Sequence, residues 1–300
     1  VLFYNGLDKL ARVRNNVVLV HGKTTLYTDS LDYDRLYNVG YFFEGGHLVT
    51  QDNDMTSDWG EYRPETKVAV FNYNVHLVSP APPQKARTTL LTDTLYYNTV
   101  TSVANARGPS TIDDGGCHIY TELGYMNSKN NDLTLLNRSE MSNNGKKLIG
   151  DSIVWNSVDS IGEAFGNVVY TDVLNKNAMT GNYCYYDDKT GYSLGTDSAC
   201  ILDFSQGPDT MYMHADSIKM YTFDIKTDSV YRTMHAFHRV RMYRKDMQGV
   251  CDSLFYTTKD SMMIMYKDPI VWTGSQQLLG EEIQAFMNDS TIDSIYVLRQ

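Results

Sequence analysis

Hydrophobic and polar positions alternate with a period of two along most of the chain, as in strands with one buried face. A five-residue pattern carries this alternation: an acidic residue, a polar residue, an apolar residue, any residue, and an aromatic residue. In the copy that begins at Asp29, Leu31 and Tyr33 fall on one face, and Ser30 and Asp32 fall on the other. The pattern therefore predicts half-buried strands.

The same pattern returns at nearly regular steps. Clear copies occupy residues 29–33, 93–97, 151–155 and 252–256, and weaker ones occupy 58–62, 122–126, 181–185, 216–220 and 281–285. Their first positions lie 29 to 36 residues apart. After each copy comes a turn rich in Asp, Asn, Lys and Gly, then a second strand, a bend and a third apolar stretch such as 167–170. One such unit cannot bury its apolar face alone, so neighbouring units must stack.

This periodicity predicts an all-β, solenoid-like stack of about nine repeats of 29–36 residues, in which the copies lie in rows about 4.8 Å apart. We expect one elongated domain over residues 1–300, cut within a repeat at both ends. A helix over residues 278–287 is the competing interpretation of one segment. Strand is preferred there because the ninth copy of the pattern falls within it.

Composition narrows the classes of function. Apolar residues make up 42% of the chain, enough for a substantial core. The formal charge of −10 argues against a nucleic-acid partner. No apolar run is long enough for a transmembrane segment. The chain contains no signal peptide, and we take one to have been removed. The four cysteines (Cys117, Cys184, Cys200 and Cys251) lack the close pairs of zinc sites, and buried thiols are favoured over disulfides.

Candidate chemistry is sparse. The stacked acidic residues that open each copy could hold calcium, but each more simply bonds backbone N–H groups at a corner. His235 and His238 are a weak metal candidate, and we expect no metal, cofactor or catalytic residue. No nucleotide-binding or nucleophile motif occurs. The cluster Arg239, Arg241, Arg244 and Lys245 either contacts lipid phosphates or an acidic partner, or is a solvated strand face, which is favoured.

The recurrent Asp-Ser-Leu-x-Tyr units, followed by Asn-Val-x-Leu-like strands, resemble OstA-like proteins of the lipopolysaccharide-transport (Lpt) system, in particular their Bacteroidota-type members. The clearest matches are residues 28–33, 93–97, 150–155 with 166–168, and 249–256. The resemblance implies an elongated, twisted β-jelly roll whose two sheets hold acyl chains between them. It also implies a periplasmic location, a role in outer-membrane biogenesis, and partners that are other Lpt-type proteins joined by edge-to-edge strand addition, or further copies of this chain.

The third and fifth positions of the copies are then candidates for the acyl-chain lining. They are Leu31, Tyr33, Gly60, Tyr62, Leu95, Tyr97, Gly124, Met126, Ile153, Trp155, Tyr183, Tyr185, Ile218, Met220, Leu254 and Tyr256. Gly60 and Gly124 are small within bulky rows and mark expected room. The alternative is that these rows fill a dry core.

The function predicted from the sequence is a non-enzymatic conduit that carries lipopolysaccharide along an apolar interior. Its rival is a structural or adhesive β-solenoid with a filled core that acts through its surface. A carbohydrate-active enzyme on a β-helix is disfavoured, because the acidic residues lie at the starts of units instead of on one exposed face.

Overall fold

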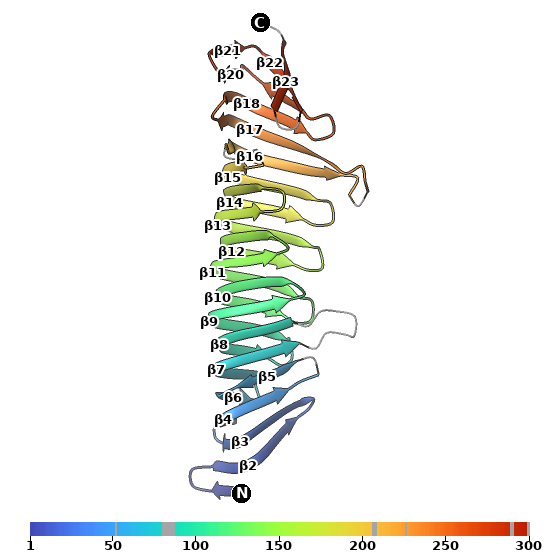
Figure 1. Cartoon of the computed structure of the whole chain (residues 1–300). Coiled ribbons are helices and arrows are strands. Elements are labelled where there is room, and N and C mark those ends of the chain that lie inside the picture. The colour runs from blue at the N-terminus through green and yellow to red at the C-terminus, as the bar shows by residue number, and fades with distance from the viewer. Residues whose placement is uncertain (52, 80–87, 206–208, 226, 289–290, 299–300) are drawn as a thin grey trace. The chain divides into compact units, whose positions relative to one another are not determined.

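The computed structural model describes residues 1–51, 53–79, 88–205, 209–225, 227–288 and 291–298. These residues form 23 strands and no helix (Figure 1). The prediction of an all-β protein is confirmed. Within the same residues, there is no helix that could cross a membrane. The chain separates into two compact units, Val1–Asn144 and Gly145–Gln300.

Unit 1 contains the first eleven strands. They are β1 (Leu2–Asn5), β2 (Leu10–His21), β3 (Thr24–Asp34), β4 (Val39–Val49), β5 (Asp54–Ser57), β6 (Trp59–Arg63), β7 (Val68–Ser79), β8 (Thr88–Asn98), β9 (Val103–Asp114), β10 (Cys117–Asn127) and β11 (Asp132–Asn143).

Unit 2 contains the other twelve. They are β12 (Lys146–Asn156), β13 (Ile161–Asp172), β14 (Asn177–Asp187), β15 (Tyr192–Asp203), β16 (Met211–Phe223), β17 (Tyr231–Arg244), β18 (Met247–Thr257), β19 (Met262–Tyr266), β20 (Ile270–Thr273), β21 (Gln276–Leu279), β22 (Glu282–Asn288) and β23 (Thr291–Leu298).

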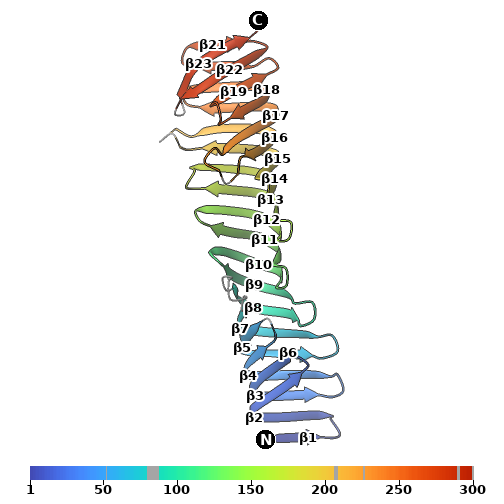
Figure 2. The ribbon, with the colours of Figure 1, turned by 90° about the vertical axis from the view of Figure 1, so that its right-hand side faces the viewer.

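Most strands are eleven or twelve residues long, pair antiparallel with their neighbours along the chain, and bend near the middle (Figure 2). At the bend the register shifts, for example between Arg14 and Val17 where β2 pairs with β3. We call this bend the corner. In unit 1, arm A is the segment of β3 before the corner together with the segments paired with it, and arm B is the segment after the corner with its partners. In unit 2, arm A is the segment of β12 before its corner, which lies between Ile149 and Ser152, with its partners, and arm B is the segment after it.

Pairs of residues with left-handed backbone produce the corners. Asn15 and Asn16 have φ of 68° and 52°, and Asn137 and Arg138 have φ of 64° and 57°. Left-handed residues inside a strand create a bulge and a strong local bend. Asparagine tolerates this conformation better than most residues, which explains its frequency at these positions.

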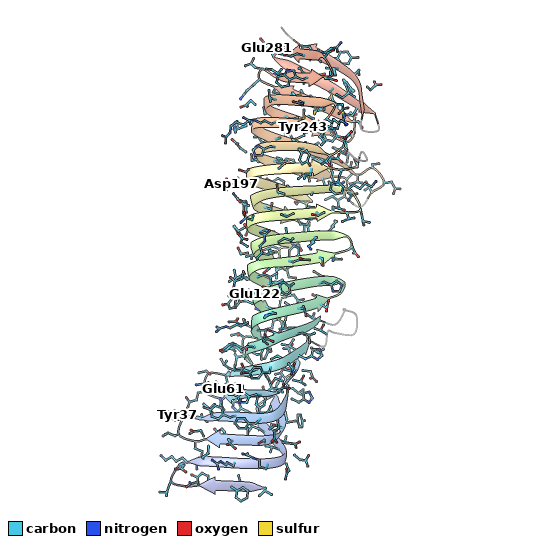
Figure 3. The ribbon with its side chains drawn as sticks, turned by 60° about the vertical axis from the view of Figure 1, so that its left-hand side comes forward. Tyr37, Glu61, Glu122, Asp197, Tyr243 and Glu281 are labelled. Atoms are coloured by element: carbon cyan, nitrogen blue, oxygen red, sulfur yellow. The ribbon has the colours of Figure 1, made fainter. Side chains whose placement is uncertain are left out.

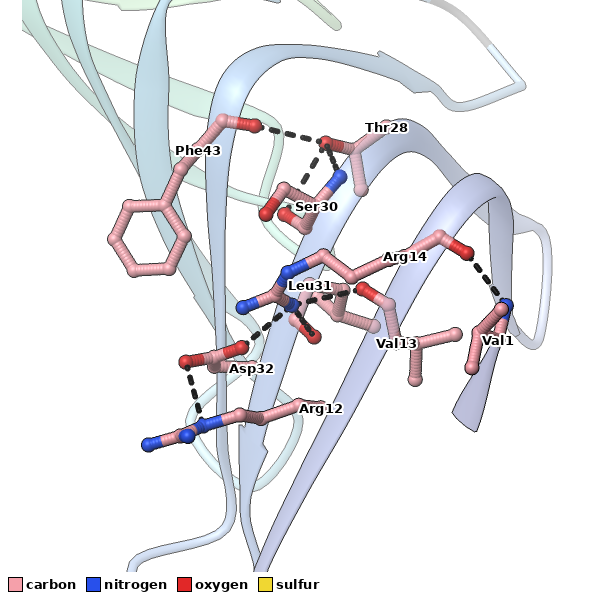
Figure 4. Close-up of polar contacts among 9 residues, drawn as sticks. All are labelled: Val1, Arg12, Val13, Arg14, Thr28, Ser30, Leu31, Asp32 and Phe43. Carbon is pink, nitrogen blue, oxygen red and sulfur yellow. Dashed lines mark hydrogen bonds and ion pairs between the residues drawn. The ribbon is translucent and has the colours of Figure 1, made fainter. Parts of the chain in front are cut away.

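Short hydroxyl side chains satisfy backbone groups that the register shift leaves unpaired. In the first corner, Thr28 Oγ1 donates to the carbonyl of Gly45 at 2.7 Å and accepts from the amide of Ser30 at 3.3 Å. Figure 4 shows the same corner, where the Arg14 guanidinium donates to the carbonyl of Leu31 at 3.1 Å and lies 2.7 Å from the Asp32 carboxylate. These contacts hold the bend.

Most copies of the sequence pattern fall on every second strand; the copy at 58–62 falls on β6, which follows the short strand β5. Residues 282–288 form β22, so the strand interpretation of this segment is confirmed over helix. The expected 4.8 Å between successive copies is wrong. Within each unit a return strand lies between successive copies, for example Phe42 between Leu31 and Gly60, so these copies are two strand spacings apart, about 10 Å.

Candidate functional site

In unit 1 we call the face that carries Leu31 and Tyr33 the inner face. In unit 2 the inner face is the one that carries Ile153 and Trp155. Cross-strand partners point to the same side of a sheet, so the register defines the rows of this face. In unit 1 one row reads Leu31, Phe42, Gly60, Phe71, Leu95, Ala106, Gly124 and Leu135. In unit 2 the equivalent row reads Ile153, Ala164, Cys184, Gly195, Ile218, Ala236, Leu254, Met265 and Ile283.

Side chains fill the inner face of unit 1. Phe42, Phe71, Leu95, Tyr97 and Leu135 are all fully buried. The predicted lining residues of this unit lie on the inner face, and of them only Tyr33 is partly exposed. This part of the chain has a packed core.

The room expected at Gly60 and Gly124 is absent. A Cβ on Gly60 would overlap the Phe42 ring and the main-chain oxygen of Val70, and one on Gly124 would lie 3.0 Å from Thr121 Cγ2. These glycines are small because side chains on neighbouring strands already occupy the space in front of them.

The inner face of unit 2 differs over β12–β16. Its floor, which follows the row from Ile153, is buried and built largely from small residues: Gly150, Ala164, Gly181, Cys184, Gly195 and Ala199. Larger apolar side chains flank that floor and are partly exposed. They are Leu148, Tyr170, Met179 and Ile201 on arm A, and Trp155, Met220 and the exposed Tyr186 on arm B. Met234 of β17 borders them, and both it and Ile201 also touch the packed core further along the unit. We call this surface the unit 2 trough.

The trough keeps its tyrosines neutral. Burial raises the pKa of Tyr170 to about 12 and that of Tyr186 to about 12, although the Arg232 charge opposes both shifts. A neutral tyrosine presents an apolar ring with one polar tip. The side chains of the trough can therefore contact an apolar ligand without burying a charge.

Further along unit 2 the inner face closes. Met213, Val240, Met242, Leu254 and Met265 belong to one buried cluster. Partly buried Met234 and Tyr256 pack against this cluster. The trough is thus bounded on one side by a packed core within the same unit.

Two residues predicted to line the interior, Tyr183 and Tyr185, do not lie on the inner face, because the predicted register of β14 is off by one residue. Cys184 and Tyr186 occupy the inner rows, because Cys184 pairs with Ala164 and Tyr186 with Gly162. Tyr183 and Tyr185 therefore point to the outer face. There the Tyr183 ring lies 5.1 Å from that of Phe165, and its hydroxyl donates to Glu163 at 2.6 Å.

The remaining predictions in unit 2 agree with the register. Ile153, Ile218 and Leu254 lie in the buried inner row. Trp155, Met220 and Tyr256 lie in the next inner row and are partly exposed. Sequence reasoning missed Tyr170 and Met179 of arm A, which belong to the apolar stretches on either side of the β13–β14 turn and alternate with the same period.

The acidic residues of the repeat line the outer side of the corners, where they bond the left-handed residues of a neighbouring strand. Asp29 Oδ1 accepts from the amide of Asn16 at 3.0 Å, and Asp58 Oδ2 accepts from the Asn74 side chain at 2.6 Å. Glu122, another member, is labelled in Figure 3. Within the described residues no group of His, Cys, Asp and Glu is arranged to hold a metal ion. These acidic residues lie at corners, as predicted, but only part of the predicted bonding is seen: Asp29 accepts from a backbone N–H, whereas Asp58 accepts from a side-chain amide.

The basic cluster does not form one patch. Arg239 Nη2 lies 2.7 Å from Asp216 at a corner, whereas Arg244 is buried and its Nε donates to Asp246 at 2.6 Å. Arg241 and Lys245 are exposed. His235 lies on the outer face between aromatic rings, and His238 bonds Asp252 at a corner. The two histidines therefore serve different contacts.

The four cysteines are free thiols in the structure; Cys184 and Cys251 are buried, whereas Cys117 and Cys200 are only partly buried. Burial raises the pKa of Cys184 to about 11 and that of Cys251 to about 12. Cys184 lies in the floor of the trough.

Comparison with known proteins gives a family match for the N-terminal part of the chain. Residues 1–82 match the family model described as OstA-like protein. The predicted resemblance to OstA-like proteins is confirmed over these residues. Among solved structures, the chain is similar to that of LptH, described as the LptA homologous periplasmic component of the conserved lipopolysaccharide transport device from Pseudomonas aeruginosa. The identity is 12%, the coverage is 37% of this chain and 79% of that chain, and the TM-score is 0.35. The comparison with curated proteins gave no match.

Proposed function

We propose that this OstA-like chain is a non-enzymatic carrier of lipopolysaccharide in the periplasm, and that acyl chains lie against the unit 2 trough. The observation that supports this most is the partial exposure of apolar side chains on the inner face of β12–β16. Inner faces of sheets are normally buried completely, as in unit 1. A surface of this kind, rimmed by polar turns, is typical of a site for an apolar ligand.

The energetics of acyl-chain binding are sufficient. Burial contributes about 0.8 kcal/mol for each CH₂, so a twelve-carbon chain contributes on the order of 9 kcal/mol before the costs of ordering are subtracted. The acyl chain would lie against the flanking side chains, since Met179 Sδ already lies 3.0 Å from the position of a Cβ on Gly195. The flexible side chains of Met179, Met220 and Met234 adapt to different chain lengths. Sugars and phosphates stay in water, and net flow takes its energy from other components.

The proposal includes partners. Other Lpt-type proteins, or further copies of this chain, would join by edge-to-edge strand addition, because an unpaired strand edge binds a further strand. Outer-membrane biogenesis is the process in which such a carrier acts. No cofactor or catalytic group is part of the mechanism.

The test places a photoreactive p-azidophenylalanine at Trp155 or Tyr186, on the inner face, and at Phe165 or Tyr183, on the outer face. Tyr183 and Tyr186 lie on the same strand and form a matched pair. Irradiation in cells that make lipopolysaccharide is expected to give covalent adducts at the two inner positions and few at the outer ones. Equal capture at both sets would count against the trough.

A second readout uses unmodified lipid. Replacement of Ile153 by Asn is expected to weaken lipopolysaccharide binding several-fold, whereas replacement of its outward neighbour Ser152 by Asn leaves it unchanged. Ile153 lies in the trough floor and its polar substitute could not contact an acyl chain without burying an amide. Purified proteins that first pass a folding check by circular dichroism are compared.

The packed core of unit 1 favours a second candidate, a structural or adhesive solenoid that acts through its surface. This candidate predicts that labels on the outer face capture partner proteins and that labels at Trp155 and Tyr186 capture no lipid. The same photocrosslinking experiment therefore separates the two functions.

A further inference from the structure

A buried hydrogen-bonded bridge joins the two arms of unit 1. Asn53 lies in the turn between β4 and β5, at the end of arm A, and its side-chain Nδ2 donates to the hydroxyl of Tyr97 on arm B at 2.7 Å. The same nitrogen lies 3.4 Å from Ser128 Oγ, in the turn after β10. Asn53 and Tyr97 are each only 1% exposed. We call these three residues the clasp.

Both ends of the clasp are held by their own turns. The amide of Asn53 donates to Thr50 Oγ1 at 3.0 Å, and the carbonyl of Asn53 accepts from the amide of Thr50 at 2.9 Å. Ser128 Oγ donates to the carbonyl of Ser102 at 3.1 Å. The clasp therefore fixes the distance between an arm A turn and two arm B turns.

The hydrogen bonding of the clasp is incomplete. Among the described residues, the buried Oδ1 of Asn53 has no hydrogen-bond partner. A buried acceptor without a partner costs free energy, so an apolar residue would stabilise this position better. A polar bridge that is incompletely satisfied is easier to open than a packed apolar contact.

The row that contains Tyr97 is suited to such opening. Its members alternate between tyrosine and small residues: Tyr33, Gly40, Tyr62, Ala69, Tyr97 and Ala104 are cross-strand neighbours in that order. Each ring fills space that the adjacent glycine or alanine leaves. If the rings of Tyr62 and Tyr97 move outward, a channel lined by small residues remains.

Tyr62 has a bridge of its own. Its hydroxyl lies 3.0 Å from Nδ1 of His21, at the end of arm A, and burial raises the pKa of this tyrosine. Both buried tyrosines of the row are thus tied to arm A by their hydroxyls, whereas the hydroxyl of Tyr33 bonds Asn38 on its own arm.

We infer that the clasp is a latch that keeps the inner face of unit 1 shut, and that releasing it admits acyl chains there. The inference rests on the proposed lipid-carrying function and adds its regulation. In the latched state the trough of unit 2 is the accessible acyl-chain site. In the released state the tyrosine row of unit 1 becomes a second one.

The test uses Tyr97→Phe in the full chain, which removes only the hydroxyl, with Tyr33→Phe as the matched control in the same row. Amide hydrogen exchange over residues 46–57 and 88–98 is expected to rise up to about tenfold in Tyr97→Phe, since one hydrogen bond contributes about that factor to closure. Tyr33→Phe is expected to leave these segments unchanged. No rise in Tyr97→Phe, or an equal rise in the control, overturns the latch.

Lipid access is measured with p-azidophenylalanine at Phe71 in unit 1 or at Trp155 in unit 2, and radiolabelled dodecanoic acid as the probe. Tyr97→Phe is expected to increase capture at Phe71 several-fold and leave capture at Trp155 unchanged. Faster exchange without increased capture at Phe71 overturns the inference while capture at Trp155 still supports the carrier function. Absence of capture at both positions, with faster exchange, overturns the carrier function instead.

Discussion

At the scale of single residues, Gly60 illustrates how tightly unit 1 is packed. Gly60→Ala would force its Cβ into the Phe42 ring and the oxygen of Val70, so we expect it to destabilise the protein by about 1–3 kcal/mol. Gly40→Ala is the control on the same face, because its Cβ would meet Leu31 Cδ1 at an ordinary 3.5 Å. Urea unfolding of both variants measures the difference, and equal midpoints would show that the core has spare room.

The sequence could not predict this packing. It places Gly60 on the inner face by its position in the repeat, but the space in front of a glycine depends on the strands beside it. Phe42 and Phe71 are its cross-strand neighbours, and neither belongs to the five-residue pattern. Whether an apolar row is open or filled therefore depends on cross-strand pairing, which the pattern alone does not give.

The thiols provide a prediction for pH. Raised pKa values mean that Cys184 (about 11) and Cys251 (about 12) hold almost no thiolate at pH 8, and the thiolate is the reactive form. We expect 5,5′-dithiobis(2-nitrobenzoic acid) to modify the less buried Cys117 and Cys200 first in the folded protein. All four should react at similar rates in denaturant.

The same shifts have a consequence for stability. The neutral thiol is favoured in the folded state, so the two thiols contribute to the free energy of unfolding below the unfolded pKa, near 9. This contribution is lost as the pH rises toward 11 to 12.

Mass spectrometry of peptides identifies which thiols react with the reagent in the folded protein. Early modification of Cys184 would mean that the floor of the trough is more accessible than the structure shows.

At the scale of elements, the corner is the feature that each repeat needs. Gly166 has φ of +72°, and a Cβ there would overlap the carboxylate of Asp151. Gly166→Ala therefore combines backbone strain with a clash, and we expect a loss of about 1–3 kcal/mol. Gly274→Ala in the same unit has φ of +55° and no atom within 4 Å, so it incurs backbone strain alone. Thermal unfolding compares the two, and a larger loss at Gly274 would contradict the role of the corner.

Strands and corners were largely predictable, because period-two alternation and Asp or Asn at fixed offsets leave a strong local signal.

The predicted register was wrong in one copy, the one at residues 181–185. The run from Asn182 to Tyr186 contains three tyrosines and a cysteine, so two alternating frames fit it equally well by hydrophobicity. Asn182 holds the corner position that is acidic in most other copies, and choosing it would have placed Cys184 and Tyr186 inward.

At the scale of the whole molecule, one repeat produces two kinds of interior. Unit 1 places Phe, Leu and Tyr along its inner rows and buries them, while unit 2 places Gly, Ala and Cys on the floor of β12–β15 and leaves larger side chains partly exposed. Both units are built from antiparallel ladders of long strands that bend at corners. We expect the side chains on the inner face to cause differences in local stability.

The effect of side chains on local stability can be tested by comparing two groups of strands within unit 2. Strands β12–β14 face the trough, whereas β17 and β18 lie in the buried cluster of Val240, Met242 and Leu254. Local opening is governed by the buried apolar contacts that are lost, so we expect amides of β12–β14 to exchange at least tenfold faster than those of β17 and β18. Saturating dodecanoic acid should slow exchange in β12–β14 alone, because a ligand stabilises the state that binds it. Uniform exchange across unit 2, insensitive to the fatty acid, would mean that the exposed rim binds no acyl chain.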